Sequence, residues 1–316
     1  MADKKVIAVL GATGAQGGGL VRAILNDKEG EFKVRALTRN PNSDKAKALG
    51  NMGAELVAVD VDNYDSLKNA FQGAYGVYAV TFFWEHFSPE KETAQVASIA
   101  KAAKEAHVQH VVWSTLEDTR KWVPLDDNRM PTLMGKYKVP HLDCKGEADK
   151  FFTEHGVPTT NLLTSFYWEN FIYFGMAPKK GEDGKLTLSL PVGDRKLAGI
   201  AAEDIGKSAY EIFKNGNQYI GKTVGISGEQ LTGKQMADIF TKALGRDVAY
   251  NAVPFDVYRG LGFPGADDIG NMFQFFHDFE NDFCEVRNVE KSRTINPPMQ
   301  DFKSWLEANK SKIPLE

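Results

Sequence analysis

The sequence predicts an α/β fold built around a parallel sheet. Short apolar runs rich in β-branched residues alternate with helical segments through the first half of the chain. This alternation is typical of parallel strands that are joined by crossover helices. The strands are apolar along their whole length rather than at every second residue, which indicates a sheet covered on both faces.

The first half supplies six strands and their connecting helices in a regular order. Strands are predicted at residues 6–10, 34–38, 56–59, 77–81, 110–114 and 158–164. The helices between them are predicted at residues 16–26, 44–52, 64–71, 89–106 and 142–155. Together they form the first of two predicted domains, residues 1–165, as a doubly wound parallel sheet with helices on both sides.

The second half loses this rhythm and predicts a smaller C-terminal α+β lobe over residues 166–316. A strand is expected at 222–226, and helical segments at 203–213, 233–244, 255–283 and 301–309. Thr232 and Gln235 form a capping-box pattern at the start of the second of these helices. We expect some of these segments to return to the sheet of the first domain.

Composition restricts the class of protein. Of 316 residues, 42% are apolar and 25% are charged, so the chain can bury a sizeable core. The formal net charge of −4 argues against binding to duplex nucleic acid, which needs a positive surface. The two cysteines, Cys144 and Cys284, lie outside any Cys/His cluster, so neither a metal site nor a disulfide framework is expected.

The sequence also indicates where the protein works. Its N-terminus lacks the basic and apolar regions of a signal peptide, and the longest uncharged apolar run, residues 73–84, is too short to span a bilayer. We therefore expect no membrane insertion and a cytoplasmic protein, with the nucleus as a second location. We further expect a monomer or a homodimer.

The strongest motif follows the first predicted strand, where residues 11–17 read GATGAQG. Three glycines at this spacing let the pyrophosphate of a dinucleotide approach the backbone, and the helix that follows offers its N-terminal N–H groups. Glycine-rich turns are common, but this one lies between a strand and a helix and opens a series of alternating units. The sequence therefore predicts a Rossmann-like dinucleotide-binding fold, with contacts from Gly11, Thr13, Gly14, Ala15, Gln16 and Gly17.

The end of the second strand indicates which dinucleotide is bound. Enzymes that use NAD usually have Asp or Glu there, and this chain has Thr38, Arg39 and Asn40. A guanidinium pairs with a 2′-phosphate that a carboxylate would repel, so the cofactor is predicted to be NADP(H). The alternative is a solvated surface arginine. Asp60 and Val61, after the third strand, are expected beside the adenine, although an Asp there is also a common turn former.

Two further strand ends are expected to contact the nicotinamide half of the cofactor. Thr81 closes the fourth strand, and the segment after the sixth strand contributes Phe166, Tyr167, Glu169 and Asn170. Aromatic rings there can cover a planar ligand, and the polar side chains can orient it. The alternative is that this segment is an aromatic core plug between the two lobes.

With these residues the chain resembles the NmrA-like family, a branch of the atypical short-chain dehydrogenase/reductases, over essentially its whole length. The resemblance rests on the glycine motif and on LTRNP at 37–41, HLDCKGE at 141–147 and LGFPGA at 261–266. Within the family the chain is most similar to the NADPH-sensor proteins of animals. The resemblance implies NADP(H) binding and control of a regulatory protein partner according to the NADPH/NADP ratio.

The resemblance also implies an alternative, because the enzymatic relatives of the family include quinone reductases and isoflavone-type reductases. In this alternative the protein is an NADPH-dependent reductase of a quinone, an enone or a similar small carbonyl compound. A third class, a sequence-specific DNA-binding repressor, is disfavoured by the net charge and by the lack of a helix-turn-helix pattern.

The choice between enzyme and sensor depends on the helix after the fifth strand. Short-chain dehydrogenases carry Tyr-x-x-x-Lys there, and this chain has His141 and Lys145. The spacing places both side chains on one helical face, where Lys145 can hold the ribose or, as the isoflavone-type reductases imply, act as a base. His141 is either a proton donor or a polar helix residue. Ser114 and Thr115 offer either a catalytic hydroxyl or strand-end caps. Because the tyrosine is missing, the sequence favours the sensor.

A sensor needs two states that bind its ligand with different affinity. Residues 115–140 form a long connection after the fifth strand, and a connection of this length inside a compact domain is usually functional or mobile. We therefore expect this segment to be disordered without cofactor and to become ordered when NADPH binds.

Overall fold

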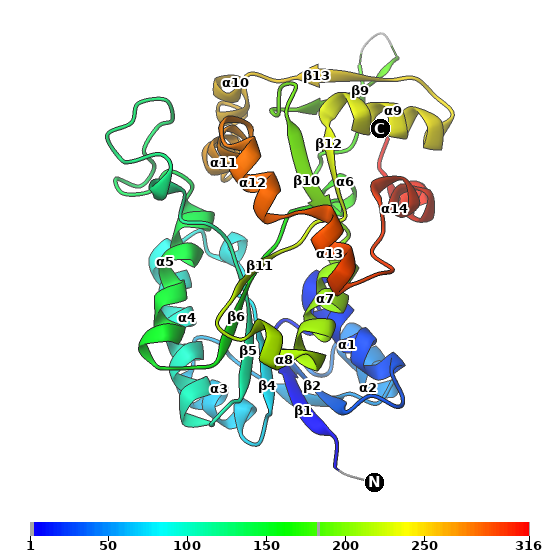
Figure 1. The fold of residues 1–316 in the computed structure, drawn as a ribbon. Helices are drawn as coiled ribbons and strands as arrows, with labels where there is room; N and C mark the ends of the chain where they lie inside the picture. Colours follow the sequence, from blue (N-terminus) through cyan, green and yellow to red (C-terminus); the bar gives the residue numbers. More distant parts are fainter. Residues whose placement is uncertain (1–2, 182–183, 316) are drawn as a thin grey trace. The chain divides into compact units, whose positions relative to one another are not determined.

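A seven-stranded sheet carries the first half of the fold in the structure, a computed structural model that describes residues 3–181 and 184–315 (Figure 1). Its strands are β1 (Lys5–Val9), β2 (Phe32–Thr38), β3 (Glu55–Ala58), β4 (Gly76–Ala79), β5 (His110–Thr115), β6 (Thr159–Leu163) and β11 (Thr223–Gly225). Their order is β11-β6-β5-β4-β1-β2-β3, and every neighbouring pair from β3 to β6 is parallel. This order confirms the predicted doubly wound, Rossmann-like sheet.

Helices cover both faces of this sheet (Figure 1). One face carries α1 (Ala15–Asn26), α2 (Asp44–Asn51) and α7 (Ala202–Lys214), and the other carries α3 (Tyr64–Phe71), α4 (Pro89–Glu105) and α5 (Pro140–Glu154). On the second face a core of buried apolar residues includes Leu67, Phe71, Ile99, Trp113 and Phe152. On the first face α1 approaches α7 at Gly19 and Gly206, where a Cβ atom at either position would overlap the other helix.

The strands and helices predicted for the first half are all present, with ends that differ by at most two residues. Short polar side chains fix three of the helix starts, because Ser43, Asn63 and Ser88 accept hydrogen bonds from N–H groups in the first turns of α2, α3 and α4. The strand order reverses between β1 and β4. In open α/β sheets, ligands bind beyond the carboxyl ends of the strands at such a point.

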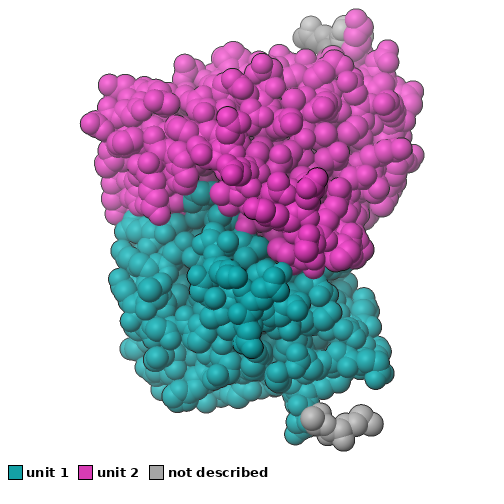
Figure 2. Space-filling view, in the orientation of Figure 1, with its two compact units in different colours: residues 1–117, 144–163, 203–224 teal, residues 118–143, 164–202, 225–316 magenta. Residues whose placement is uncertain are grey.

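The chain forms two compact units whose boundaries cross the sequence several times (Figure 2). Unit 1 comprises Met1–Glu117, Cys144–Leu163 and Glu203–Val224, and unit 2 comprises Asp118–Asp143, Thr164–Ala202 and Gly225–Glu316. The predicted domains, 1–165 and 166–316, differ from these units at three places, the smallest being Thr164 and Ser165, which group with unit 2. Residues 118–143 group with unit 2, and residues 203–224, with most of α7, α8 (Gly216–Tyr219) and the start of β11, group with unit 1.

Unit 2 contains two small sheets of three strands each. Their strands are β7 (Phe166–Tyr167), β8 (Lys179–Lys180), β9 (Leu186–Leu190), β10 (Lys196–Ile200), β12 (Glu229–Thr232) and β13 (Val248–Ala252). One sheet has the order β12-β10-β7 and the other β13-β9-β8. The helices are α6 (Asn170–Tyr173), α9 (Gly233–Leu244), α10 (Phe255–Arg259), α11 (Ala266–Asp278), α12 (Glu280–Val286), α13 (Val289–Ile295) and α14 (Phe302–Asn309).

Local signals explain several of the unit 2 elements. Helix α9 begins with the predicted capping box of Thr232 and Gln235. The aromatic-rich stretch 255–283 is divided among α10, α11 and α12. Aromatic rings pack together inside the unit, where Phe302 contacts Trp168, Phe240 and Trp305. Within the residues that the structure describes, no helix combines the length and the apolar character needed to cross a membrane.

Candidate functional site

The glycine motif lies between β1 and α1 and depends on its glycines. Gly11 has a positive φ of 62°, a conformation that favours glycine. A Cβ atom at Gly17 would overlap the carbonyl group of Gly11, so a glycine is required for α1 to begin this close to the strand. Among the described residues, no side chain caps α1 at Gly14, and the first turn of α1 holds no acidic residue. The positive end of this helix can therefore receive an anionic group.

The other residues of the motif divide between surface and interior. Ala15 is exposed, and Thr13 is half-buried. The side-chain oxygen of Gln16 accepts hydrogen bonds from the hydroxyls of Tyr78 and Ser114, the latter at 2.8 Å. Ser114 is thus held by the motif itself. This contact favours the structural interpretation of its hydroxyl over the catalytic one.

Arg39 extends into solvent beyond the end of β2, with 71% of its side chain exposed. Thr38 is half-buried, and Asn40 is exposed beside it. The Arg39 Nη1 donates to Oε1 of Glu85, the last residue of the short 3-10 helix η1 (Phe83–Glu85). The chain around Arg39 carries no signal for this partner, because Glu85 belongs to the connection that follows β4.

Asp60 and Val61 follow β3, as predicted, and their contacts are local. Asp60 Oδ1 accepts a hydrogen bond from the backbone N–H of Asp62 at 3.0 Å, while its own N–H donates to Ser66 Oγ at 3.0 Å. Val61 packs against the apolar core of unit 1. These contacts favour the turn-forming role of Asp60, whose side chain remains exposed.

A buried polar cluster surrounds Lys145 in unit 1. The Lys145 Nζ lies 2.6 Å from Oε1 of Glu92 and donates to Oγ1 and the carbonyl oxygen of Thr81, at 2.7 and 3.2 Å. Thr81 Oγ1 in turn donates to Glu92 Oε1 at 2.6 Å. Thr81 follows β4, Glu92 lies in the first turn of α4, and Lys145 lies on α5. The structure therefore brings together the predicted residues Thr81 and Lys145, and it adds Glu92.

Glu92 is fully buried, so its charge depends on its partners. Burial by itself raises the pKa of Glu92, but the charge of Lys145 and hydrogen bonds from Lys145 and Thr81 outweigh this effect and hold the pKa below its usual value. His86 Nε2 lies 3.3 Å from the other oxygen of this carboxylate, Oε2. An ammonium has three N–H donors, and the Thr81 and Glu92 oxygens supply three acceptors. A ribose hydroxyl that reaches Lys145 must therefore share or replace one of these contacts.

His141 lies one helical turn before Lys145 but groups with unit 2. Its Nδ1 is 2.7 Å from Oδ1 of Asp268, and its backbone N–H donates to Oδ2 of the same carboxylate at 3.2 Å. Asp268 is buried in the first turn of α11. A carboxylate at Nδ1 orients the ring and fixes its tautomer, which an acid–base histidine requires. The backbone contact also anchors the start of α5, so the geometry is compatible with both predicted roles of His141.

The predicted contact region after β6 groups with unit 2 and contributes Phe166, Tyr167, Glu169 and Asn170. Phe166 is buried and packs against two other phenylalanine rings. The Glu169 carboxylate accepts hydrogen bonds from the backbone N–H of Ala202 at 2.9 Å and from Trp305 Nε1 at 3.1 Å. Tyr167 is half-buried, and α6 begins at the residue after Glu169. These contacts lie within unit 2 and favour a role in its core for Phe166 and Glu169.

The family model and the similar proteins point to the same family, the NmrA-like family. The model of the NmrA-like family matches residues 3–306. An NmrA-like family domain-containing protein of Dictyostelium discoideum is 29% identical over 293 residues, which cover 88% of this chain and 88% of the relative. An NmrA-like family domain-containing oxidoreductase of Aspergillus flavus is 27% identical over 291 residues, or 87% of this chain and 84% of that one.

Solved structures show the same fold. The negative transcriptional regulator NmrA, solved in complex with NADP, has a TM-score of 0.79 at 22% identity, over 96% of this chain and 95% of that one. The triphenylmethane reductase of Citrobacter sp., complexed with NADP(H), has a TM-score of 0.76 at 20% identity, over 97% and 99%. These matches confirm the resemblance and the fold class predicted from the sequence.

Proposed function

Because the chain belongs to the NmrA-like family, we propose that it binds NADP(H) through unit 1 and senses the NADPH/NADP ratio for a protein partner. The observation that carries the proposal is the glycine loop, which leads into the uncapped start of α1, with Arg39 beyond the neighbouring strand β2. Support comes from NmrA and triphenylmethane reductase, similar folds that were solved with NADP and NADP(H). We further propose a cytoplasmic location and a monomeric or homodimeric state.

The residues of unit 1 fit successive parts of the cofactor. The pyrophosphate would lie against the start of α1, in a loop that a Cβ atom at Gly17 would distort. The 2′-phosphate would pair with the exposed guanidinium of Arg39. The nicotinamide ribose would lie near Thr81 and Lys145, whose polar atoms are already in contact.

The test of this proposal is cofactor preference. We expect the wild-type protein to bind NADPH more tightly than NADH, and Arg39→Ala to remove most of that preference. A charge-assisted hydrogen bond contributes roughly 1.5–3 kcal/mol, which corresponds to about tenfold to a hundredfold in affinity. Isothermal titration calorimetry with both nucleotides measures it. Equal affinity of the wild-type protein for the two would contradict the proposal.

A pair of neighbouring glycines supplies a matched control for the location of the site. Gly17→Ala places a Cβ atom against the Gly11 carbonyl and should lower the affinity for both nucleotides by about tenfold or more. At Gly18 the added Cβ would lie 3.1 Å from the guanidinium of Arg22 and 3.4 Å from the carbonyl oxygen of Ala12. A small shift of the Arg22 side chain relieves the closer contact, so Gly18→Ala should bind both nucleotides as the wild-type protein does. If Gly17→Ala binds both nucleotides as tightly as the wild-type protein, the site does not lie at the glycine loop.

A second candidate function is favoured by the two oriented side chains on α5. His141 contacts Asp268, Lys145 contacts Glu92, and the relative from Aspergillus flavus is named as an oxidoreductase. In a reductase, NADPH supplies the hydride, while His141 or Lys145 supplies the proton to the reduced quinone, enone or similar small carbonyl compound. The missing tyrosine keeps the sensor as our first proposal.

Turnover measurements separate these two functions. We expect little or no reaction with simple aldehydes, ketones or alcohols. If a quinone or an enone is reduced, Lys145→Ala should lower kcat/KM more than His141→Phe, because Lys145 would contact the ribose as well as move the proton. Robust alcohol oxidation that His141→Phe abolishes would instead identify His141 as the acid–base group and favour the enzyme over the sensor.

A further inference from the structure

We propose that Glu85 sets how strongly the protein prefers NADP(H) over NAD(H), because it competes with the 2′-phosphate for Arg39. This inference rests on the proposed function, since it concerns the adenosine end of the same cofactor site. The sequence places no acid next to Arg39, and the fold brings one there from another strand end. Glu85 is therefore a specificity-determining residue that the local sequence does not reveal.

The position of Glu85 follows from the order of the strands. Arg39 follows β2, and Glu85 follows β4, whose neighbour in the sheet is β1, which lies between β4 and β2. The contact between Arg39 Nη1 and Glu85 Oε1 therefore reaches past the end of β1, where the glycine loop begins. This is the edge of the sheet at which a doubly wound fold binds its dinucleotide.

The segment that carries Glu85 is anchored on both sides of that residue. Phe83 is buried, and its ring packs against Trp84 at a centroid distance of 5.4 Å. His86 Nε2 lies 3.3 Å from the buried carboxylate of Glu92. Glu85 is thus held beside Arg39 by its neighbours, although its own side chain is about half exposed to solvent.

The chemistry of the two nucleotides makes this carboxylate discriminate between them. The 2′-phosphate of NADP(H) is anionic, so it must replace the Glu85 carboxylate as the partner of the Arg39 guanidinium. It then lies close to that carboxylate, which repels it. NAD(H) has a 2′-hydroxyl instead, and a carboxylate at this place can accept its hydrogen bond, as the usual acid of NAD-binding folds does. Glu85 therefore opposes NADP(H) and supports NAD(H), while Arg39 favours NADP(H).

The expected size of the effect follows from the exposure of the pair. Arg39 is 71% and Glu85 is 48% exposed, so solvent and salt screen their attraction. Glu85→Gln should raise the ratio of NADPH to NADH affinity by about three- to tenfold, the range expected for one exposed ion pair together with one lost hydrogen bond to the ribose. The gain should shrink as the salt concentration rises.

The experiment is a double-mutant cycle read by calorimetry. NADPH and NADH are titrated into the wild-type protein, Glu85→Gln, Arg39→Ala and the double variant, at low and at high salt. We expect Glu85→Gln to raise the NADPH/NADH affinity ratio in the wild-type background and to raise it less in the Arg39→Ala background, where the competition for Arg39 is absent. Glu90→Gln is the matched control, because Glu90 is an exposed acid in the first turn of the adjoining helix α4. The NADPH/NADH affinity ratio of this variant should stay at the wild-type value.

Three outcomes would count against the proposal in different ways. An unchanged or lower ratio in Glu85→Gln overturns it outright. An equal rise in the Arg39→Ala background, or in Glu90→Gln, overturns it as well, because the effect would then come from net charge rather than from competition for Arg39. Failure of the wild-type protein to bind either nucleotide would overturn the proposed function, and this inference with it.

Discussion

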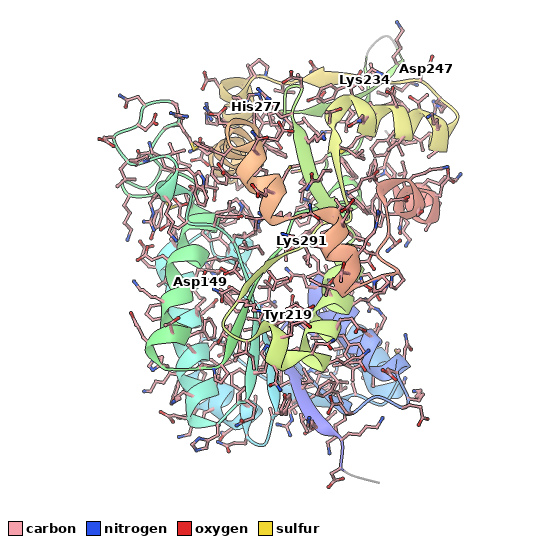
Figure 3. All side chains as sticks on the ribbon, viewed as in Figure 1. Asp149, Tyr219, Lys234, Asp247, His277 and Lys291 are labelled. Carbon is pink, nitrogen blue, oxygen red and sulfur yellow. The ribbon has the colours of Figure 1, made fainter. Side chains whose placement is uncertain are left out.

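Charged side chains inside unit 1 decide how firmly the predicted nicotinamide end of the site is held. Lys145 lies on α5 in contact with the buried carboxylate of Glu92, which belongs to α4. One turn further along α5, the Asp149 carboxylate accepts hydrogen bonds from Trp113 Nε1 at 2.8 Å and Thr115 Oγ1 at 2.6 Å; Figure 3 shows Asp149 on this helix. Two polar anchors therefore fix the register of α5 against the strand and the helix beside it. The Thr115 hydroxyl takes part in the second of these anchors, where it donates to Asp149.

Glu92→Gln tests the first anchor. The variant leaves the Lys145 ammonium buried beside a neutral amide, and breaking a buried ion pair in this way costs about 3–5 kcal/mol. We expect a loss of that order in the free energy of unfolding, measured by urea denaturation. Replacing both partners in Glu92→Gln/Lys145→Gln should cost less than the sum of the single changes. Glu90→Gln, on the exposed side of the same turn, should stay within about 0.5 kcal/mol of wild type.

The pH dependence of stability should also report the buried ion pair of Glu92 and Lys145. The pKa of Glu92 is held below its ordinary value of 4.5 in the folded protein, so the carboxylate contributes stability above that pH. This contribution is lost as the pH falls through the folded pKa. Glu92→Gln should therefore lose less stability than wild type on acidification from neutral pH. Parallel acid profiles for the two proteins would show that Glu92 does not titrate as described.

At the scale of elements, the sequence was sufficient wherever the cause of a structure is local. The alternation of apolar strands and helices predicted a doubly wound parallel sheet, and the capping residues at Ser88 and Thr232 mark where α4 and α9 begin. The glycine loop was predictable because the conformation of Gly11 and the close approach at Gly17 are demands on single residues.

The rest of the candidate site depends on contacts between elements that the sequence keeps far apart. Glu85, Glu92 and Asp268 each meet a predicted residue through the packing of another strand end or helix, so no spacing in the chain reveals them. The small sheets were hidden for a different reason. The strand β7, for example, has two residues, too few to show a period.

At the scale of the whole chain, helix α5 runs through the point at which the units divide. Its residues up to Asp143 group with unit 2, and those from Cys144 onward group with unit 1. His141 and Lys145 therefore take their partners from different units, Asp268 from unit 2 and Glu92 from unit 1. If the cofactor contacts Lys145, we expect the response to pass along α5 to His141, one turn earlier in the same helix. The segment that leads into α5 is therefore the first place to look for a response.

That segment, residues 118–143, is held within unit 2 by buried polar contacts. The Asp143 carboxylate accepts hydrogen bonds from the backbone N–H groups of Thr119, Lys138 and Val139, at 2.8, 2.8 and 3.1 Å. From α11, Asn271 Nδ2 donates to two carbonyl oxygens of the segment, those of Pro131 and Lys138. Complete disorder of residues 115–140 in the absence of cofactor, which the length of that connection predicts, would break all of these contacts. We therefore expect a smaller change, in how often they open.

Hydrogen exchange measures that change. If the protein is a sensor, NADPH should slow exchange in peptides from residues 118–143. The effect should be largest at the N–H groups of Thr119, Lys138 and Val139, because their acceptor, Asp143, lies on the helix that carries Lys145. Peptides from α9 should exchange equally with and without NADPH and serve as the internal control. Lys145→Ala should keep nucleotide binding measurable but weaken the protection in 118–143. A ligand shifts an equilibrium only when it binds the two states differently. The contradicting result is a protein that binds NADPH but shows the same exchange in this segment and the same sedimentation with and without it. Such a protein would not have the two states that a sensor needs. That result would exclude this sensor mechanism and leave the reductase as the function to pursue.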